Sequence, residues 1–136
     1  FVTVDLEGGL VNRLRSVWGE LPSPASAAAA GRKAVRALGE AAGAGCRSLG
    51  IHLNLAPVVD LERPNAYLAG QQRCFAPDPD RVSVLARLFT DGLASWGAAG
   101  WGAARRPVRS RVVSAMPRSV PNRSTHRETA APLLRR

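Results

Sequence analysis

The sequence predicts an α/β fold with a parallel sheet, and two observations support this prediction. The chain contains two successive strand–loop–helix units, over residues 2–49 and 51–97, and right-handed crossovers between such units place their strands in parallel. Each predicted strand also ends in a carboxylate followed by a polar loop, Asp5 in the first unit and Asp60 in the second. At 136 residues, the chain is long enough for one modest domain but shorter than the roughly 250 residues of a complete (β/α)8 barrel.

The first unit opens with a strand and a glycine turn. The β-branched run Val2–Val4 favours a short buried strand, and it leads through Asp5 and Glu7 into the pair Gly8-Gly9. Two consecutive glycines allow a sharp turn and a close approach of the backbone to a ligand. With Arg13 after the turn, the pattern indicates the edge of a polar binding pocket, although an exposed turn with ordinary surface charges would also fit.

A helix is expected over residues 32–49 because apolar residues recur there at intervals of three and four. Glycines within this segment lower its helix propensity, which predicts a close approach between the helix and a sheet. The predicted buried stripe consists of Val35, Leu38, Ala42, Cys46 and Leu49, and the glycines are Gly39, Gly43 and Gly45.

The second unit begins with a predicted strand over residues 51–60, whose apolar run is typical of a strand buried on both faces. We expect His52 to pack between strand and helix, and Asn54 to make a structural hydrogen bond across the barrel interior. A loop over residues 61–79 follows, and Asp78-Pro79-Asp80 then predicts a helix start. The expected buried stripe of that helix is Val82, Leu85, Leu88, Phe89, Leu93 and Trp96, and Gly97 ends it.

Four polar residues fall at or just after the predicted strand ends: Asp5, Arg13, Asp60 and Arg73. In a parallel β/α architecture the binding site lies at the carboxyl ends of the strands, so we expect these side chains to share one pocket. The structural alternative is a set of ion pairs, Arg73 with Asp60 or Asp78 and Arg13 with Glu7.

Other classes of site have little support in the sequence. Cys46 and Cys74 lie outside any C-x-x-C motif, so we expect two free, partly buried thiols. Neither His52 nor His126 has metal-ligand spacing, and we expect no metal and no cofactor. The longest uncharged stretch, residues 92–104, is too short for the roughly 20 apolar residues of a membrane span, so no membrane partner is expected.

Three segments, in order, resemble family 3 glycoside hydrolases, especially their bacterial β-N-acetylhexosaminidase branch. They are V-D-x-E-G-G-x-V-x-R at residues 4–13, L-G-I-x-L-N-L-A-P-V-V-D at residues 49–60, and R-C-F-A-P-D-P-D-R-V at residues 73–82. The third departs from the family's R-S-F-G-x-D-P-x-x-V at Cys74 and Ala76. The resemblance covers residues 1–100 and implies a partial (β/α)8 TIM barrel, truncated at both ends.

The resemblance also implies a function. Such enzymes are retaining glycosidases, and Asp5, Arg13 and Arg73 would bind the hydroxyl groups of a carbohydrate substrate, with Glu7 and Asp60 in supporting roles. The expected substrate is a terminal β-linked N-acetylglucosamine or a β-glucoside. Cell-wall recycling in the cytoplasm is what the branch implies. The family's nucleophile lies on a later strand, so no residue of this chain is expected to be catalytic.

The last quarter of the chain differs in composition. Residues 1–100 hold ten basic and nine acidic residues, whereas residues 101–136 hold nine arginines, no lysine and one acid, Glu128. No convincing third strand follows Gly97, and the family's lysine–histidine–phenylalanine–proline–glycine segment, which leads to a catalytic histidine, is absent. We expect a disordered or out-of-frame tail; a shifted reading frame that restores this segment would establish the latter.

The alternative function is a non-enzymatic protein whose arginine-rich tail binds nucleic acid or an acidic surface. We do not favour nucleic-acid binding, because Trp101 is the tail's single aromatic residue and offers no series of stacking platforms.

Overall fold

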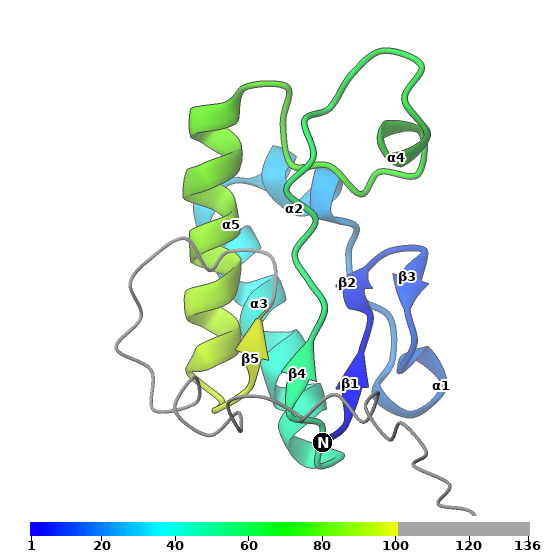
Figure 1. Ribbon diagram of the computed structural model, residues 1–136, viewed down its shortest axis with the longest axis vertical. Helices are drawn as coiled ribbons and strands as arrows, with labels where there is room; N and C mark the ends of the chain where they lie inside the picture. The colour runs from blue at the N-terminus through cyan, green and yellow to red at the C-terminus, as the bar shows by residue number, and fades with distance from the viewer. Residues whose placement is uncertain (101–136) are drawn as a thin grey trace, which may run out of the picture.

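The computed structural model describes residues 1–100, and within them it contains a parallel sheet, a β-hairpin and five helices (Figure 1). The predicted arginine-rich tail, residues 101–136, lies outside the described residues. The sheet consists of β1 (Thr3–Val4), β4 (Leu53–Asn54) and β5 (Ala99–Gly100), and the hairpin of β2 (Leu6–Gly8) and β3 (Val11–Asn12). The helices are α1 (Arg15–Trp18), α2 (Pro24–Ala30), α3 (Arg32–Ser48), α4 (Tyr67–Gly70) and α5 (Pro79–Ala94).

The three sheet strands are parallel, in the order β1-β4-β5, which confirms the predicted α/β fold with a parallel sheet. Thr3 pairs with Leu53, and Leu53 pairs with Ala99 on its other side. The helices α3 and α5 connect these strands and lie on one side of the sheet (Figure 1). The three strands do not close into a barrel within residues 1–100.

The expectation that no third strand follows Gly97 was wrong. Gly97 has φ +77°, and the chain then enters β5, where the Ala99 amide donates to the His52 carbonyl at 3.2 Å. Small residues suit this strand, because a Cβ at Gly100 would lie 3.0 Å from Leu93 Cδ2 and 3.2 Å from the Ala56 carbonyl oxygen. The missing β-branched residues therefore reflect close packing and not the absence of a strand.

The two long helices begin and end near the predicted residues. The Asp78 carboxylate caps α5 by accepting a hydrogen bond from the Arg81 amide at 2.7 Å, as the Asp-Pro-Asp pattern predicts. A similar signal starts α2, where the Ser23 hydroxyl accepts from the Ser26 amide at 3.1 Å and Pro24 follows. The apolar spacing does not predict α2, because its alanines form no apolar stripe.

The glycines of α3 allow a close approach, but to a helix and not to a sheet as predicted. A Cβ at Gly39 would collide with the Phe89 carbonyl oxygen of α5, and one at Gly43 would lie 2.7 Å from the Leu93 carbonyl oxygen. On α5, a Cβ at Gly92 would likewise collide with the Arg36 carbonyl oxygen of α3. The third glycine, Gly45, lies under the Trp18 ring, where a Cβ would be 3.1 Å from indole Nε1.

The core lies between these helices, the sheet and the hairpin. Most of both predicted stripes is buried, but Leu49 and Trp96 at the helix ends are about half exposed, contrary to prediction. Leu55, directly after β4, is also exposed, so the second strand unit is not buried on both faces. The buried apolar residues include Leu6, Val35, Leu38, Ala42, Cys46, Ala56, Phe75, Val82, Leu85, Phe89 and Leu93.

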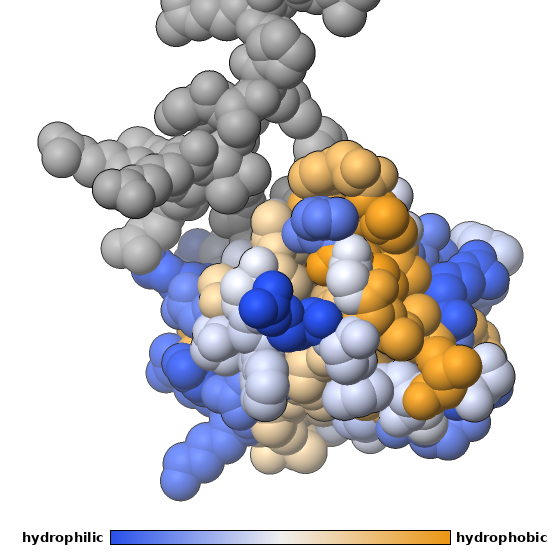
Figure 2. Space-filling model, turned by 90° about the horizontal axis from the view of Figure 1, so that it is seen from below, coloured by the Kyte–Doolittle hydropathy of each residue, from blue (hydrophilic) through white to orange (hydrophobic). Residues whose placement is uncertain are grey.

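Some apolar side chains remain on the surface. Seen from below, hydrophobic side chains gather over one part of the molecule beside strongly hydrophilic ones (Figure 2). Phe1 is 81% exposed and Val2 50% exposed, at the start of β1. None of the helices formed by residues 1–100 combines the length and the apolar character needed to cross a bilayer.

Candidate functional site

The candidate site lies at the carboxyl ends of β1 and β4. Asp5 follows β1 directly, and the hairpin β2–β3 then turns at Gly8 and Gly9, which have φ +98° and +55°. After β4 the chain runs into the long segment that carries α4 and Arg73 (Figure 1). Because β1 and β4 are parallel neighbours, both loops emerge at the same edge of the sheet.

A partly buried ion pair joins the hairpin to the loop after β4. Arg73 donates from Nε to Glu7 Oε2 at 2.8 Å and from Nη2 to Glu7 Oε1 at 2.7 Å. The Glu7 side chain is 3% exposed and that of Arg73 is 22% exposed. A bidentate pair of this kind fixes the plane of the guanidinium as well as its position.

The charge on Arg73 is stabilised by its surroundings. The hydrogen bond to Glu7 raises the pKa of the Arg73 guanidinium, burial opposes this, and the negative charges of Glu7 and Asp5 add to the rise. Asp5 therefore lies within electrostatic reach of Arg73, although 68 positions separate the two in the sequence.

Asn54 fixes the backbone that carries both acids. Its side chain is fully buried at the end of β4, where Oδ1 accepts from the Leu6 amide at 3.0 Å and Nδ2 donates to the Leu6 carbonyl at 2.9 Å. Leu6 lies between Asp5 and Glu7, so Asn54 fixes the peptide group that follows Asp5 and the one that precedes Glu7. The predicted structural hydrogen bonding of Asn54 is confirmed, but its partner is the backbone of β2 beside it and not a group across a barrel interior.

The remaining predicted site residues are more peripheral. Asp5 is partly buried, whereas Arg13 and Asp60 are exposed. Within residues 1–100, the side chain of Arg13 takes part in none of the hydrogen bonds or ion pairs. The alternative ion pairs are wrong, because Arg73 binds Glu7 instead of Asp60 or Asp78, and Glu7 is consequently not the partner of Arg13.

Gln71 also belongs to this region, although no sequence pattern predicts it. Its Oε1 lies 3.4 Å from Arg73 Nη1, and it also borders a hollow of about 500 Å³ between the hairpin turn and α4. Gly9, Arg15, Ser23 and Gln72 border the same hollow. Local signals miss Gln71 because its place depends on how the loop after β4 folds back over the hairpin.

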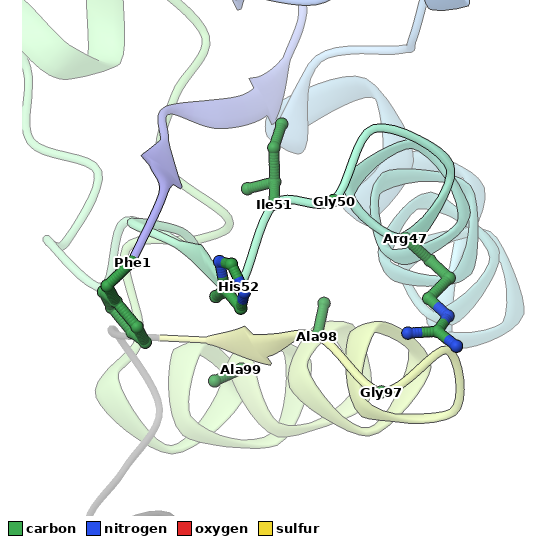
Figure 3. A pocket seen from close by; sticks show the side chains of 8 residues that line it. All are labelled: Phe1, Arg47, Gly50, Ile51, His52, Gly97, Ala98 and Ala99. Atoms are coloured by element: carbon green, nitrogen blue, oxygen red, sulfur yellow. The ribbon is translucent and has the colours of Figure 1, made fainter.

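A second hollow, of about 240 Å³, lies at the opposite, amino-terminal end of the strands (Figure 3). His52 and Phe1 border it, and their rings stack with centroids 5.4 Å apart. His52 Nδ1 accepts from the Val2 amide at 3.1 Å, and the side chain is exposed. The prediction that His52 packs between strand and helix was therefore wrong.

At the carboxyl ends of β1 and β4, the available chemistry is hydrogen bonding by charged groups. Arg73 offers planar donors and Asp5 offers acceptors, a combination that suits the hydroxyl groups of a polar ligand. Within residues 1–100, no group of three or more His, Cys, Asp or Glu residues is placed to hold a metal ion. Both thiols are free, as predicted, and both are buried.

Comparison with known proteins points to one family. Residues 1–103 match the model of the glycosyl hydrolase family 3 N-terminal domain. The chain is 36% identical over 101 residues to a beta-hexosaminidase of Methylococcus capsulatus, covering 71% of this chain and 30% of that protein. It is 39% identical over 99 residues to the beta-hexosaminidase LpqI of Mycobacterium tuberculosis, covering 71% of this chain and 25% of that protein.

Solved structures agree with this assignment. NagZ from Neisseria gonorrhoeae superposes with a TM-score of 0.69 at 29% identity, over 75% of this chain and 32% of that one. LpqI of M. tuberculosis gives a TM-score of 0.65 at 35% identity, over 73% and 29%. The chain thus spans less than a third of the length of these relatives.

Proposed function

The chain belongs to glycosyl hydrolase family 3, and from this we propose that it forms part of a (β/α)8 barrel that binds a terminal β-linked N-acetylglucosamine. The relatives named beta-hexosaminidase support this sugar class. So does a structure of the N. gonorrhoeae NagZ in complex with N-trifluoroacetyl-D-glucosamine. The proposal places the sugar at the carboxyl ends of β1 and β4.

The observation that carries the proposal is the Glu7–Arg73 ion pair, whose guanidinium lies within electrostatic reach of Asp5. The pair fixes the guanidinium of Arg73 against the hairpin that follows Asp5, and the Asp5 carboxylate is partly buried. Arg73 would donate hydrogen bonds to sugar hydroxyl groups and Asp5 would accept them. Arg13, on the exposed side of the hairpin, would donate to the same ring from its rim, and Asp60 would support the loop after β4.

We propose that the residues of this chain position a sugar without cleaving it. A retaining glycosidase needs a carboxylate nucleophile and a proton donor flanking the scissile bond. The family's lysine–histidine–phenylalanine–proline–glycine segment, which leads to the proton-donor loop, does not occur in this sequence. Orientation of the substrate is the contribution that Asp5, Arg13 and Arg73 would make.

The proposal predicts that the chain binds N-acetylglucosamine and that Asp5→Ala abolishes binding, because the carboxylate that accepts from the hydroxyl groups is lost. Titration of the ¹⁵N-labelled protein, followed by NMR, measures this. The same protein is expected to release no aglycone from an aryl β-N-acetylglucosaminide.

Asp91→Ala provides the matched control, because Asp91 is an exposed carboxylate on α5. It should bind the sugar like the unchanged protein. Equal binding by Asp5→Ala would refute the role of Asp5. Robust hydrolysis would refute the proposal that this chain only positions the sugar.

A further inference from the structure

We propose that Glu7 is a positioning residue for Arg73, which it holds in one orientation so that the Nη1 side of the guanidinium binds the sugar. The inference rests on the function proposed above and adds to it how the arginine is presented.

Glu7 occupies one complete edge of the guanidinium. Arginine has five N–H donors, and Glu7 takes one from Nε and one from Nη2, at 2.8 and 2.7 Å. Among residues 1–100, Nη1 makes a single long contact, 3.4 Å to Gln71 Oε1. A ligand hydroxyl can therefore bind at Nη1 without breaking the ion pair.

Glu7 is itself held in place, so it can act as a fixed support. Its side chain is 3% exposed, and the preceding residue, Leu6, is bound on both its amide and its carbonyl by Asn54. Gly8 follows at φ +98°, packed so closely that a Cβ there would collide with the Pro22 carbonyl oxygen. The carboxylate consequently has little freedom to follow a moving arginine.

Two substitutions of Glu7 distinguish the effect of its negative charge from the effect of its side-chain length. If Glu7 only supplied a negative charge near Arg73, aspartate would serve nearly as well. Because the bidentate contact depends on the length of the side chain, Glu7→Asp keeps the charge but cannot reach both nitrogens from the same fixed backbone. Glu7→Gln keeps the length but offers one oxygen and a competing NH₂ donor.

The test uses the ¹⁵N-labelled chain and two NMR readouts. The first is the Nε–Hε signal of Arg73, assigned by its loss in Arg73→Lys, which reports the ion pair directly. The second is the affinity for N-acetylglucosamine. Glu7→Gln and Glu7→Asp are each expected to shift the Nε–Hε signal and to weaken sugar binding by about 10- to 100-fold, since losing a hydrogen bond to a charged group reduces affinity by about that factor.

Glu40→Gln is the matched control, because Glu40 accepts from Arg36 Nε at 2.9 Å on the exposed face of α3. It makes the same chemical change away from the site and should leave affinity unchanged. Wild-type affinity in Glu7→Gln or Glu7→Asp, with the Arg73 signal shifted, would overturn the inference. If one Glu7 variant does not fold, the other decides. Failure of the unchanged protein to bind the sugar is a separate result, and it overturns the proposed function.

Discussion

At the scale of single residues, the two cysteine thiols are free and buried, and burial makes both harder to deprotonate. Cys46 lies in the core between α3 and its neighbours, and Cys74 follows Arg73 in the loop after β4. Burial raises the pKa of both thiols above the ordinary value of 9.0. For Cys74, the nearby carboxylates Asp60 and Glu62 add to the rise, and Arg73 opposes it.

These raised pKa values predict that the free energy of unfolding falls in alkali. The thiols of the unfolded chain lose their protons near pH 9.0 while the folded ones keep theirs, so deprotonation favours the unfolded state. The thiol contribution is fully present below the ordinary pKa. It is lost as the pH rises above it, by about 1.4 kcal/mol for each pH unit by which folding delays the titration. Urea unfolding at a series of pH values measures the slope.

Cys46→Ala and Cys74→Ala are the controls for this slope. Each substitution should slightly lower the free energy of unfolding at neutral pH, because a buried sulfur atom is lost from the packing. Above the ordinary thiol pKa, the free energy of unfolding should fall less steeply than in the unchanged protein, because one thiol with a raised pKa has been removed. Identical slopes in all three proteins would show that the thiols do not carry the pH dependence.

The residue types of the site could be predicted from the sequence, but their pairing could not. Asp5 and Glu7 could be selected because a predicted strand leads through them into a glycine turn, and Arg73 because it follows a predicted strand end in a segment that resembles the family's. Arg73 binds Glu7 and not Asp60 because of the course that the loop after β4 takes. Glu7 and Arg73 are 66 positions apart in the sequence, so no local pattern indicates this pairing. The same applies to Asn54, whose type suggested a hydrogen bond while its partner Leu6 depends on strand pairing.

At the scale of elements, α3 and α5 form the most extensive contact between two elements of residues 1–100, and it depends on glycine. Gly39 and Gly92 face each other's helices so closely that the backbones nearly touch. The helical spacing of apolar residues predicted both helices well, because that signal is local. It could not show what the glycines approach, since a sheet and a second helix both require a small residue.

Gly39→Ala is therefore expected to destabilise the fold, although alanine is the better helix former. Its Cβ would collide with the backbone carbonyl of Phe89, which cannot rotate away as a side chain would. We expect a loss of on the order of 1–3 kcal/mol, measured as a lower urea midpoint with an unchanged slope.

Gly70→Ala supplies the comparison. Gly70 ends α4, and a Cβ there would meet nothing within 4 Å, so stability should stay the same or rise by up to about 1 kcal/mol. Equal stability of Gly39→Ala and the unchanged protein would mean that the two helices can move apart at little cost.

At the scale of the whole molecule, the sheet has two outer strands, and the outer edge of each is paired by none of the described residues. The order β1-β4-β5 leaves one side of β1 and one side of β5 open within residues 1–100. Phe1 and Val2, which directly precede β1 in the chain, are exposed apolar residues. The parallel sheet was predictable from the repeated units. The strand β5, by contrast, could not be predicted, because its closely packed position requires small residues in place of the β-branched ones that indicate a strand.

Unpaired edges of this kind predict that the chain associates with itself, because free backbone donors and acceptors on one copy can pair with those on another. Light scattering coupled to size-exclusion chromatography, over a range of protein concentrations, should show an average mass that rises above that of one chain. Thr3→Lys places a charge on the exposed edge strand β1 and should reduce association. Ser83→Lys adds the same charge on the exposed surface of α5 and should not. If the unchanged protein remains a monomer with a sharp, cooperative thermal transition, or if both lysine variants act alike, the open edges are not what drives association.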